Sequence, residues 1–136
     1  MSWVVDTCVI IDILHNDSRF GEKSAALVDR MVPEGLIVCP VSYIELAPAF
    51  LGDKRLQEEF LAAIGVDFTM VWDAEVTRRA HQAWHRQIGL RKMGQVAKRP
   101  AADMMIGAFA SLQKGLLTRN PDDFKRVFPS LTILTP

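Results

Sequence analysis

The chain has 136 residues, 49% of them hydrophobic, and its 16 basic and 16 acidic side chains cancel to a formal net charge of zero. The length fits one domain around a single hydrophobic core, and the apolar content argues against an intrinsically disordered chain. The balanced charge excludes binding of nucleic acid or an anionic membrane through an overall electrostatic field, so any contact with nucleic acid has to be local. We therefore expect one domain over residues 1–136.

The two cysteines indicate a reducing compartment. Cys8 and Cys39 stand in apolar surroundings without paired spacing, which is typical of reduced thiols rather than of disulfides or a zinc site. The N-terminus lacks the features of a signal peptide, and no run of about eighteen uncharged apolar residues could span a bilayer. The sequence therefore predicts a cytoplasmic protein without a membrane segment.

Short apolar runs alternate with segments of helical periodicity along the chain. This alternation predicts an α/β three-layer sandwich with a mostly parallel central sheet of four to five strands, flanked by helices. The expected strands are Trp3–Val5, Leu36–Cys39, Phe68–Trp72, Leu116–Thr118 and Leu131–Leu134. The expected helices are Thr7–Leu14, Glu22–Met31, Ser42–Leu51, Lys54–Ile64, Asp73–Ile88 with Asp73 as N-cap, Pro100–Lys114 with Pro100 in the first position, and a short helix from Asn120 to about Val127, whereas Gly89–Arg99 is expected to be a loop.

The apolar run Trp3–Val5 ends abruptly on Asp6. A charge is rarely buried without a partner, and sites in open α/β sheets collect at the carboxyl ends of the strands. Asp6 is therefore expected where a central strand emerges into a cleft. The alternative is that Asp6 merely caps the helix that follows.

Further acids are expected at the same edge of the sheet. In right-handed βαβ units each helix starts at this edge, which places Glu45 and Asp103, in first helical turns, and Asp122 and Asp123, after the fourth strand, close to Asp6. Carboxylates packed together repel one another unless a cation neutralises them, and oxygen ligands alone favour Mg²⁺ or Mn²⁺ over zinc. Such a cation suits phosphodiester hydrolysis, so the pattern predicts a metal-dependent hydrolytic site.

Each acid also has a structural interpretation. Ser42 and Glu45 are spaced as a capping box, Asn120 and Asp123 have a similar spacing, and an acid such as Asp103 is favoured near a helix N-terminus by the helix dipole. The agreement of four positions on one edge favours a common site over four separate caps.

Four segments resemble, in order and spacing, the motifs of PIN-domain nucleases. They are Val4–Asp12 (VVDTCVIID), Val41–Leu46 (VSYIEL), Ala102–Ala108 (ADMMIGA) and Leu117–Phe124 (LTRNPDDF). A single-domain chain of this size is similar to VapC-type toxins of bacterial toxin–antitoxin pairs. The resemblance implies a PIN-like fold and an endoribonuclease that depends on Mg²⁺ or Mn²⁺, is usually a homodimer, and is held inactive by a small antitoxin protein.

The resemblance also implies roles for individual residues. The catalytic and metal-binding acids would be Asp6, Glu45, Asp103 and Asp123, with Asp122 as an adjacent competitor for the fourth place. Thr7, Thr118 and Asn120 would support the site by hydrogen bonds. The chain departs from the family's pattern at Cys8, where serine or asparagine is common, at Met104 and Gly107, where alanine is more usual, and at Pro48, which interrupts the helix after Glu45.

The segment from Arg86 to Arg99 contains five basic residues and no acid. Its candidates for contacts with RNA phosphates are Arg91, Lys92, Lys98 and Arg99. The alternative is a solvated basic loop. Arg119 is expected to pair with the acids, and Asp12 is expected to be solvated.

Two rival functions remain. An aspartate-based phosphatase would also place an aspartate after the first strand, but it requires a second aspartate two residues later, where this chain has Cys8. A catalytically inactive PIN-fold interaction module is the other rival. Retention of all four acids argues against that module, because unused buried acids are costly.

Overall fold

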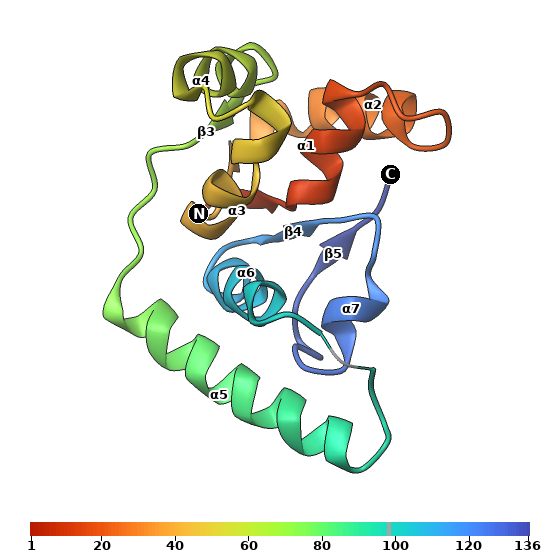
Figure 1. Ribbon diagram of the computed structural model, residues 1–136, viewed down its shortest axis with the longest axis vertical. Helices are drawn as coiled ribbons and strands as arrows, with labels where there is room; N and C mark the ends of the chain where they lie inside the picture. The colour runs from red at the N-terminus through yellow and green to blue at the C-terminus, as the bar shows by residue number, and fades with distance from the viewer. Residues whose placement is uncertain (98) are drawn as a thin grey trace.

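The computed structural model describes residues 1–97 and 99–136, in which strands and helices alternate (Figure 1). The strands are β1 (Trp3–Val5), β2 (Leu36–Ile37), β3 (Val66–Asp67), β4 (Gly115–Leu117) and β5 (Ile133–Leu134). The helices are α1 (Thr7–Leu14), α2 (Gly21–Met31), α3 (Pro40–Glu45), α4 (Lys54–Ala63), α5 (Ala74–Lys92), α6 (Ala101–Ser111) and α7 (Asp122–Lys125), with short 3-10 helices η1 (Val32–Glu34) and η2 (Ala47–Phe50). No helix in these ranges combines the length and the apolar character that crossing a bilayer requires.

The strands form one parallel sheet in the order β3-β2-β1-β4-β5. Trp3 of the central strand pairs with Leu36 on one side and with Gly115 on the other. The chain therefore winds outward from β1 in one direction through β2 and β3, and later in the opposite direction through β4 and β5. The reversal creates a switch point between β1 and β4, which is where crevices form in open α/β sheets.

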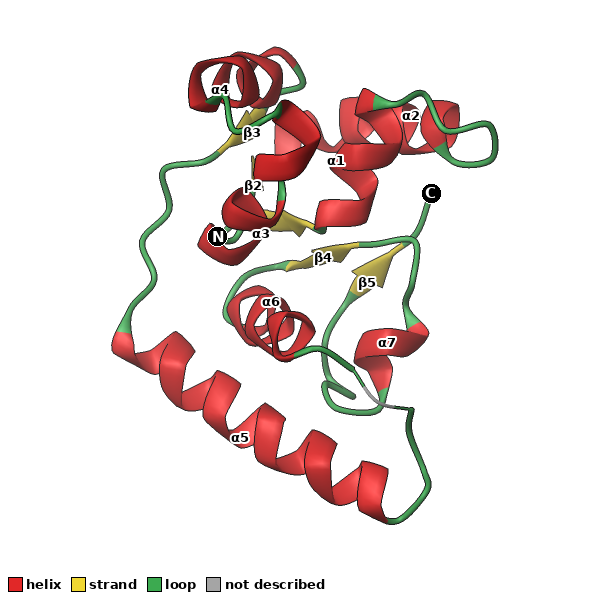
Figure 2. Ribbon diagram, in the orientation of Figure 1, coloured by secondary structure: helices red, strands yellow, loops and turns green. Residues whose placement is uncertain are grey.

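Helices cover both faces of the sheet (Figure 2). Val5 of β1 packs into a core with residues of α1, α2 and α4, whereas its neighbour Val4 packs on the other face with residues of α5, α6 and α7. Both valines are fully buried, because successive side chains of a strand point to opposite faces and both faces are covered. This arrangement confirms the predicted α/β three-layer sandwich.

The third strand differs from the prediction. Phe68–Trp72 is not a strand, because the ladder ends with β3 at Asp67 and the chain then leaves the sheet for α5. Every second side chain of Phe68–Trp72 is nevertheless half-buried. Trp72, for example, stacks on Phe109 with ring centroids 6.3 Å apart. The alternation in the sequence therefore reflects packing on the core rather than strand pairing.

The predicted helix Ser42–Leu51 is also different. Pro40 is the first residue of α3, where its missing N–H leaves no bond unmade, and the helix gives way to η2 around Pro48, which cannot donate to the preceding turn. Ser42 is thus fully buried inside the helix, and Glu45 is the last helical residue. The capping box of Ser42 and Glu45, which the sequence offered as the structural alternative for Glu45, is therefore not formed.

The connection between α5 and α6 is shorter than predicted. Asp73 caps α5 through its side chain, as predicted, but the helix continues past Gly89, so that Arg91 and Lys92 lie in its last turn, where the helix dipole favours cations. Pro100 is the N-cap of α6 rather than its first residue. The predicted RNA contact Lys98 lies outside the described residues. The other predicted elements are present, with bounds that differ by a few residues.

Candidate active site

Asp6 lies at the switch point, directly after β1. Its N–H donates to the carbonyl of Leu117 at 2.9 Å, which ties it to the end of β4. Its Oδ1 accepts the backbone N–H of Thr7 at 2.8 Å, and its Oδ2 accepts the hydroxyl of Thr118 at 2.7 Å. One oxygen of Asp6 therefore caps α1, which is the structural alternative that the sequence offered, and the other oxygen accepts from the residue that directly follows β4.

The environment of Asp6 disfavours its charge. The residue is 7% exposed, and burial raises the pKa of its carboxyl above the usual value. Hydrogen bonds from Thr118, Cys8 and Thr7 offset part of this rise in pKa, whereas the charge of Glu45 adds to it. The carboxylate form would consequently gain from a cation nearby.

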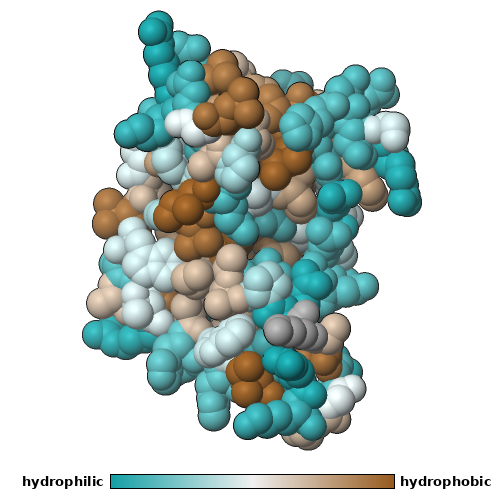
Figure 3. All heavy atoms as spheres, viewed as in Figure 1, coloured by the Kyte–Doolittle hydropathy of each residue, from teal (hydrophilic) through white to brown (hydrophobic). Residues whose placement is uncertain are grey.

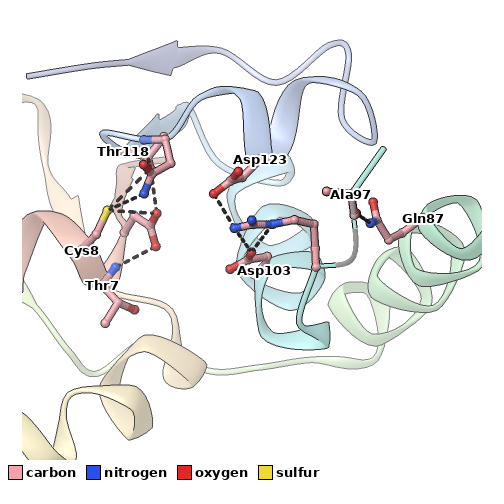
Figure 4. Close-up of polar contacts among 10 residues, drawn as sticks. Thr7, Cys8, Gln87, Ala97, Asp103, Thr118 and Asp123 are labelled. Atoms are coloured by element: carbon pink, nitrogen blue, oxygen red, sulfur yellow. Dashed lines mark hydrogen bonds and ion pairs between the residues drawn. The ribbon is translucent and has the colours of Figure 1, made fainter. Parts of the chain in front are cut away.

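Cys8 contributes a weak donor to this end of the sheet. Its Sγ lies 3.4 Å from Oδ2 of Asp6 and 3.8 Å from Oγ1 of Thr118 (Figure 4). Burial, with the charge of Asp6 as a second cause, raises the pKa of the Cys8 thiol to about 11, so the thiol is protonated at neutral pH and can donate. The sequence identified this residue as a departure from the family's pattern and missed the contact.

The turn after β4 brings Thr118 and Asn120 to Asp6. The buried hydroxyl of Thr118 donates to Asp6 and accepts the backbone N–H of Asn120 at 3.1 Å. The side-chain amide of Asn120 lies 3.8 Å from the sulfur of Cys8. These contacts are compatible with the predicted supporting roles.

Glu45 reaches the same edge from the end of α3. Its Oε1 accepts the hydroxyl of Thr7 at 2.7 Å, a contact that joins α3 to the first residue of α1. The sequence placed Glu45 in a first helical turn, and the structure places it one turn later because α3 begins at Pro40. Thr7 and Glu45 nevertheless come together with Asp6.

Asp103 and Asp123 lie in the first turns of α6 and α7 and face a shared cation. Nη2 of Arg99 is 3.1 Å from Oδ2 of Asp103 and 2.5 Å from Oδ2 of Asp123, and Nε of Arg99 also donates to Asp103 at 3.3 Å (Figure 4). Asp122 is exposed. Of the two adjacent acids, Asp123 is therefore the one that faces Asp103.

The charges of these acids act on one another. Burial raises the pKa of the Asp103 carboxyl, and the neighbouring Arg99 offsets part of that rise. The negative charges of Asp6 and Asp123 push the pKa of Asp103 further up. The acid that follows β1 and the acids of α6 and α7 are thus close enough to interact electrostatically.

The four acids share an edge but do not form a closed cluster. In residues 1–97 and 99–136, no three histidine, cysteine, aspartate or glutamate side chains stand close enough together to hold a metal ion. Asp6 and Glu45 bond to threonine hydroxyls, and Asp103 and Asp123 are bridged by Arg99. The sequence proposed Arg99 for RNA contacts and missed this bridge, because Arg99 precedes the N-cap of α6 and the spacing rules for helical ion pairs do not apply to it.

A second ion pair lies beside the site. Asp12 is 4% exposed, so the expectation that it is solvated is wrong. Arg119 was expected to pair with the acids of the site, but its Nε lies 3.2 Å from Oδ2 of Asp12 instead. The guanidinium also lies over the ring of Phe20 at 5.1 Å. This ion pair, which is not a hydrogen bond, lies between the turn after β4 and α1.

One departure from the family's pattern has a steric reason. Gly107 lies in α6 below the site, and a Cβ added there would come within 2.3 Å of the Phe128 ring. The usual alanine would therefore clash in this chain.

Comparisons with known proteins agree with this fold. The model of a family described as PIN domain matches residues 3–128. Among solved structures, the chain is similar to a chain in the crystal structure of VapBC2 from Rickettsia felis bound to a DNA fragment from their promoter. That match has a TM-score of 0.67 at 15% identity and covers 99% of this chain and 98% of the other. No curated protein matches the chain.

Proposed function

This chain belongs to the PIN domain family, and we propose that it is a metal-dependent endoribonuclease that acts as the toxin of a toxin–antitoxin pair. The observation that carries the proposal is the position of Asp6, Glu45, Asp103 and Asp123 on the carboxyl edge of the sheet, at its switch point. Desolvation raises the pKa values of Asp6 and Asp103, and the charges of neighbouring acids raise them further, which is unfavourable for the fold and favours a functional reason for these acids.

The chemistry of these side chains fits a hard divalent cation. Mg²⁺ and Mn²⁺ prefer carboxylate oxygens, and four carboxylates from four elements provide them. Asp6 and Asp103 are desolvated, so a cation would stabilise their charged forms. We propose these two acids as the central ligands, with Glu45 and Asp123 on either side.

The roles of the residues follow from their contacts. A bound cation would polarise the scissile phosphate and lower the pKa of an attacking water. Thr118 and the N–H of Thr7 hold the two oxygens of Asp6 in a fixed orientation, and Thr7 orients Glu45. Arg91 and Lys92 at the end of α5 are exposed and are proposed to contact RNA phosphates through salt-sensitive interactions.

The proposed protein partners are a second copy of the chain and a small antitoxin. The similarity to a chain of a VapBC2 structure supports a partner of that kind. Apolar side chains gather over the α3 and α4 region of the surface in Figure 3. Ile44, Leu51 and Leu56 are exposed large apolar residues of this part of the chain. Size-exclusion chromatography with light scattering, with and without the co-expressed product of the neighbouring gene, measures both associations.

The test of the activity compares RNA cleavage by the purified chain in Mg²⁺, Mn²⁺ and EDTA. Asp123→Asn should lose most of the cleavage, whereas Asp122→Asn should keep it, because the first acid faces Asp103 and its neighbour is exposed. The two variants differ from the parent by the same charge at adjacent positions. Asp6→Asn is a second inactive variant, and asparagine can still cap α1.

The proposal would be supported by cleavage in Mg²⁺ or Mn²⁺ that disappears in EDTA. The Asp6→Asn and Asp123→Asn variants should also lose cleavage, whereas Asp122→Asn should keep it. Cleavage that survives in both Asp6→Asn and Asp123→Asn would come from a contaminating nuclease or from another site. A folded chain that binds neither metal nor RNA would favour the interaction module instead.

A further inference from the structure

The guanidinium of Arg99 lies between Asp103 and Asp123, two of the proposed metal ligands. Its guanidinium donates to Oδ2 of Asp103 from both Nε and Nη2, and the same Nη2 donates to Oδ2 of Asp123. One arginine thus joins the first turns of α6 and α7, which are separated in sequence by β4. The two carboxylates thus share the single positive charge of one residue of this chain.

The backbone favours this position of Arg99. The residue directly precedes Pro100, the N-cap of α6, and a residue before proline is restricted to extended conformations. From there the side chain folds back over the first turn of α6. The Arg99 side chain is still 33% exposed, compared with 18% for Asp103 and 25% for Asp123, so it lies at the solvent side of the pair and has room to turn outward.

Arg99 and a divalent cation would compete for the Oδ2 atoms of Asp103 and Asp123, both of which accept from the guanidinium. The two positive groups would repel one another in a partly buried site, and the oxygens that accept from Arg99 are among those a metal would need. The absence of a closed cluster of metal ligands in the described residues agrees with an arrangement that has the arginine in place.

We propose that Arg99 is a resident counter-cation that competes with the divalent metal for Asp103 and Asp123, so that metal binding requires the guanidinium to swing away from the site. This inference rests on the proposed function, because it takes Asp103 and Asp123 to be metal ligands. It adds a restraint on metal loading that is built into the chain itself. The site without metal is held together by Arg99, and the affinity for metal is lower than the four acids alone would give.

Binding of Mn²⁺ to the intact chain, measured by isothermal titration calorimetry, tests the competition without an activity assay. Arg99→Gln should bind Mn²⁺ about five- to tenfold more tightly than wild type, in the lower range of coupling between interacting ligands. Arg99→Lys keeps the charge and should stay close to wild type. Arg78→Gln, at an exposed position of α5, removes the same charge elsewhere and corrects for the change in net charge.

A second measurement uses the wild-type chain and does not depend on the variants folding. The Nε–H resonance of Arg99 is followed by NMR while Mg²⁺ is added. Release of the ion pairs should shift this resonance, with the same midpoint as metal binding. A resonance that stays unchanged at saturating Mg²⁺ would overturn the inference.

The outcomes separate this inference from the proposed function. Tighter Mn²⁺ binding by Arg99→Gln than by Arg78→Gln supports the competition. Equal or weaker binding by Arg99→Gln overturns it, and the metal site itself still stands if Asp103→Asn abolishes Mn²⁺ binding. If neither wild type nor Arg99→Gln binds Mn²⁺, both the metal site and the competition are refuted.

Discussion

The hydrogen bond between Thr118 and Asp6 connects the ends of the two strands at the switch point, and its removal is a sharp test of how this edge is held. Thr118→Val keeps the shape of the side chain and removes the hydroxyl that donates to Oδ2 of Asp6 at 2.7 Å. The same change removes the acceptor for the N–H of Asn120. Both groups lose a partner in a site where Thr118 is fully buried and Asp6 is 7% exposed.

The expected loss is about 2 kcal/mol in the free energy of unfolding, since hydrogen bonds to charged groups contribute roughly 1.5–3 kcal/mol. For a domain of this size, that loss lowers Tm by roughly 5–10 °C. Urea denaturation in EDTA measures it as a lower midpoint at an unchanged m value. The matched control is Thr69→Val, because the hydroxyl of Thr69 donates to Asp67 at the same distance of 2.7 Å but on the exposed surface. The control should change stability by less than about 0.5 kcal/mol.

A double-mutant cycle separates this bond from general effects of the substitution. If Thr118 acts through Asp6, the loss caused by Thr118→Val should shrink by about 1–2 kcal/mol when Asp6 is already asparagine. A Thr118→Val chain as stable as wild type would refute the reasoning. So would a loss that is identical in the two backgrounds, because Thr118 would then contribute through its packing and its contact with Asn120 rather than through Asp6.

Three further predictions concern the fold around the site. Gly89→Ala should stabilise the chain by roughly 0.5–1 kcal/mol, since nothing lies within 4 Å of the added Cβ. Gly107→Ala should destabilise the chain by roughly 1–3 kcal/mol, because the added Cβ clashes with Phe128. Urea midpoints of the two variants that move in the same direction would contradict this prediction. Burial raises the pKa of Asp12 above its ordinary value of 3.8 in spite of the nearby Arg119, so the folded state keeps the proton to higher pH than the unfolded state. The stability of wild type relative to Asp12→Asn should therefore fall as pH rises from about 4 through the folded-state pKa and then level off, and a pH-independent difference would exclude this cause. Burial raises the pKa values of Cys8 and Cys39 to about 11. Neither thiol should therefore react quickly with a thiol reagent near neutral pH until the chain is unfolded. Rapid labelling of the native chain would show that the raised pKa values are wrong.

The sequence by itself determined the architecture and the edge at which the acids lie. Apolar runs of strand length between helical segments require a covered parallel sheet, and the fixed handedness of the connections brings strand ends and helix starts to one edge. For that reason Asp6, Asp103 and Asp123 could be placed at that edge from local pattern alone. Local chemistry also predicted Asp73 as the cap of α5.

Local pattern failed where the outcome depended on neighbours in space. The alternation of Phe68–Trp72 is real, but a strand needs a partner for its backbone groups, and this segment leaves the edge of the sheet to pack on the core. Glu45 reaches the site from a helix that begins earlier than its spacing suggested, because Pro40 is a good first helical residue.

The contacts that define the site were decided by the tertiary structure. Thr118 and Asp6 are 112 positions apart in the chain, and Arg99 and Asp123 are 24 apart, so no local pattern predicts that they bond. Folding also decided that Asp123 rather than Asp122 faces Asp103, and that the burial of Asp12 is accompanied by a pairing with Arg119. Sequence patterns indicate which residues share a face or an edge. Which charged side chains pair with one another depends on which of them meet across that edge. These contacts form only when distant elements pack together.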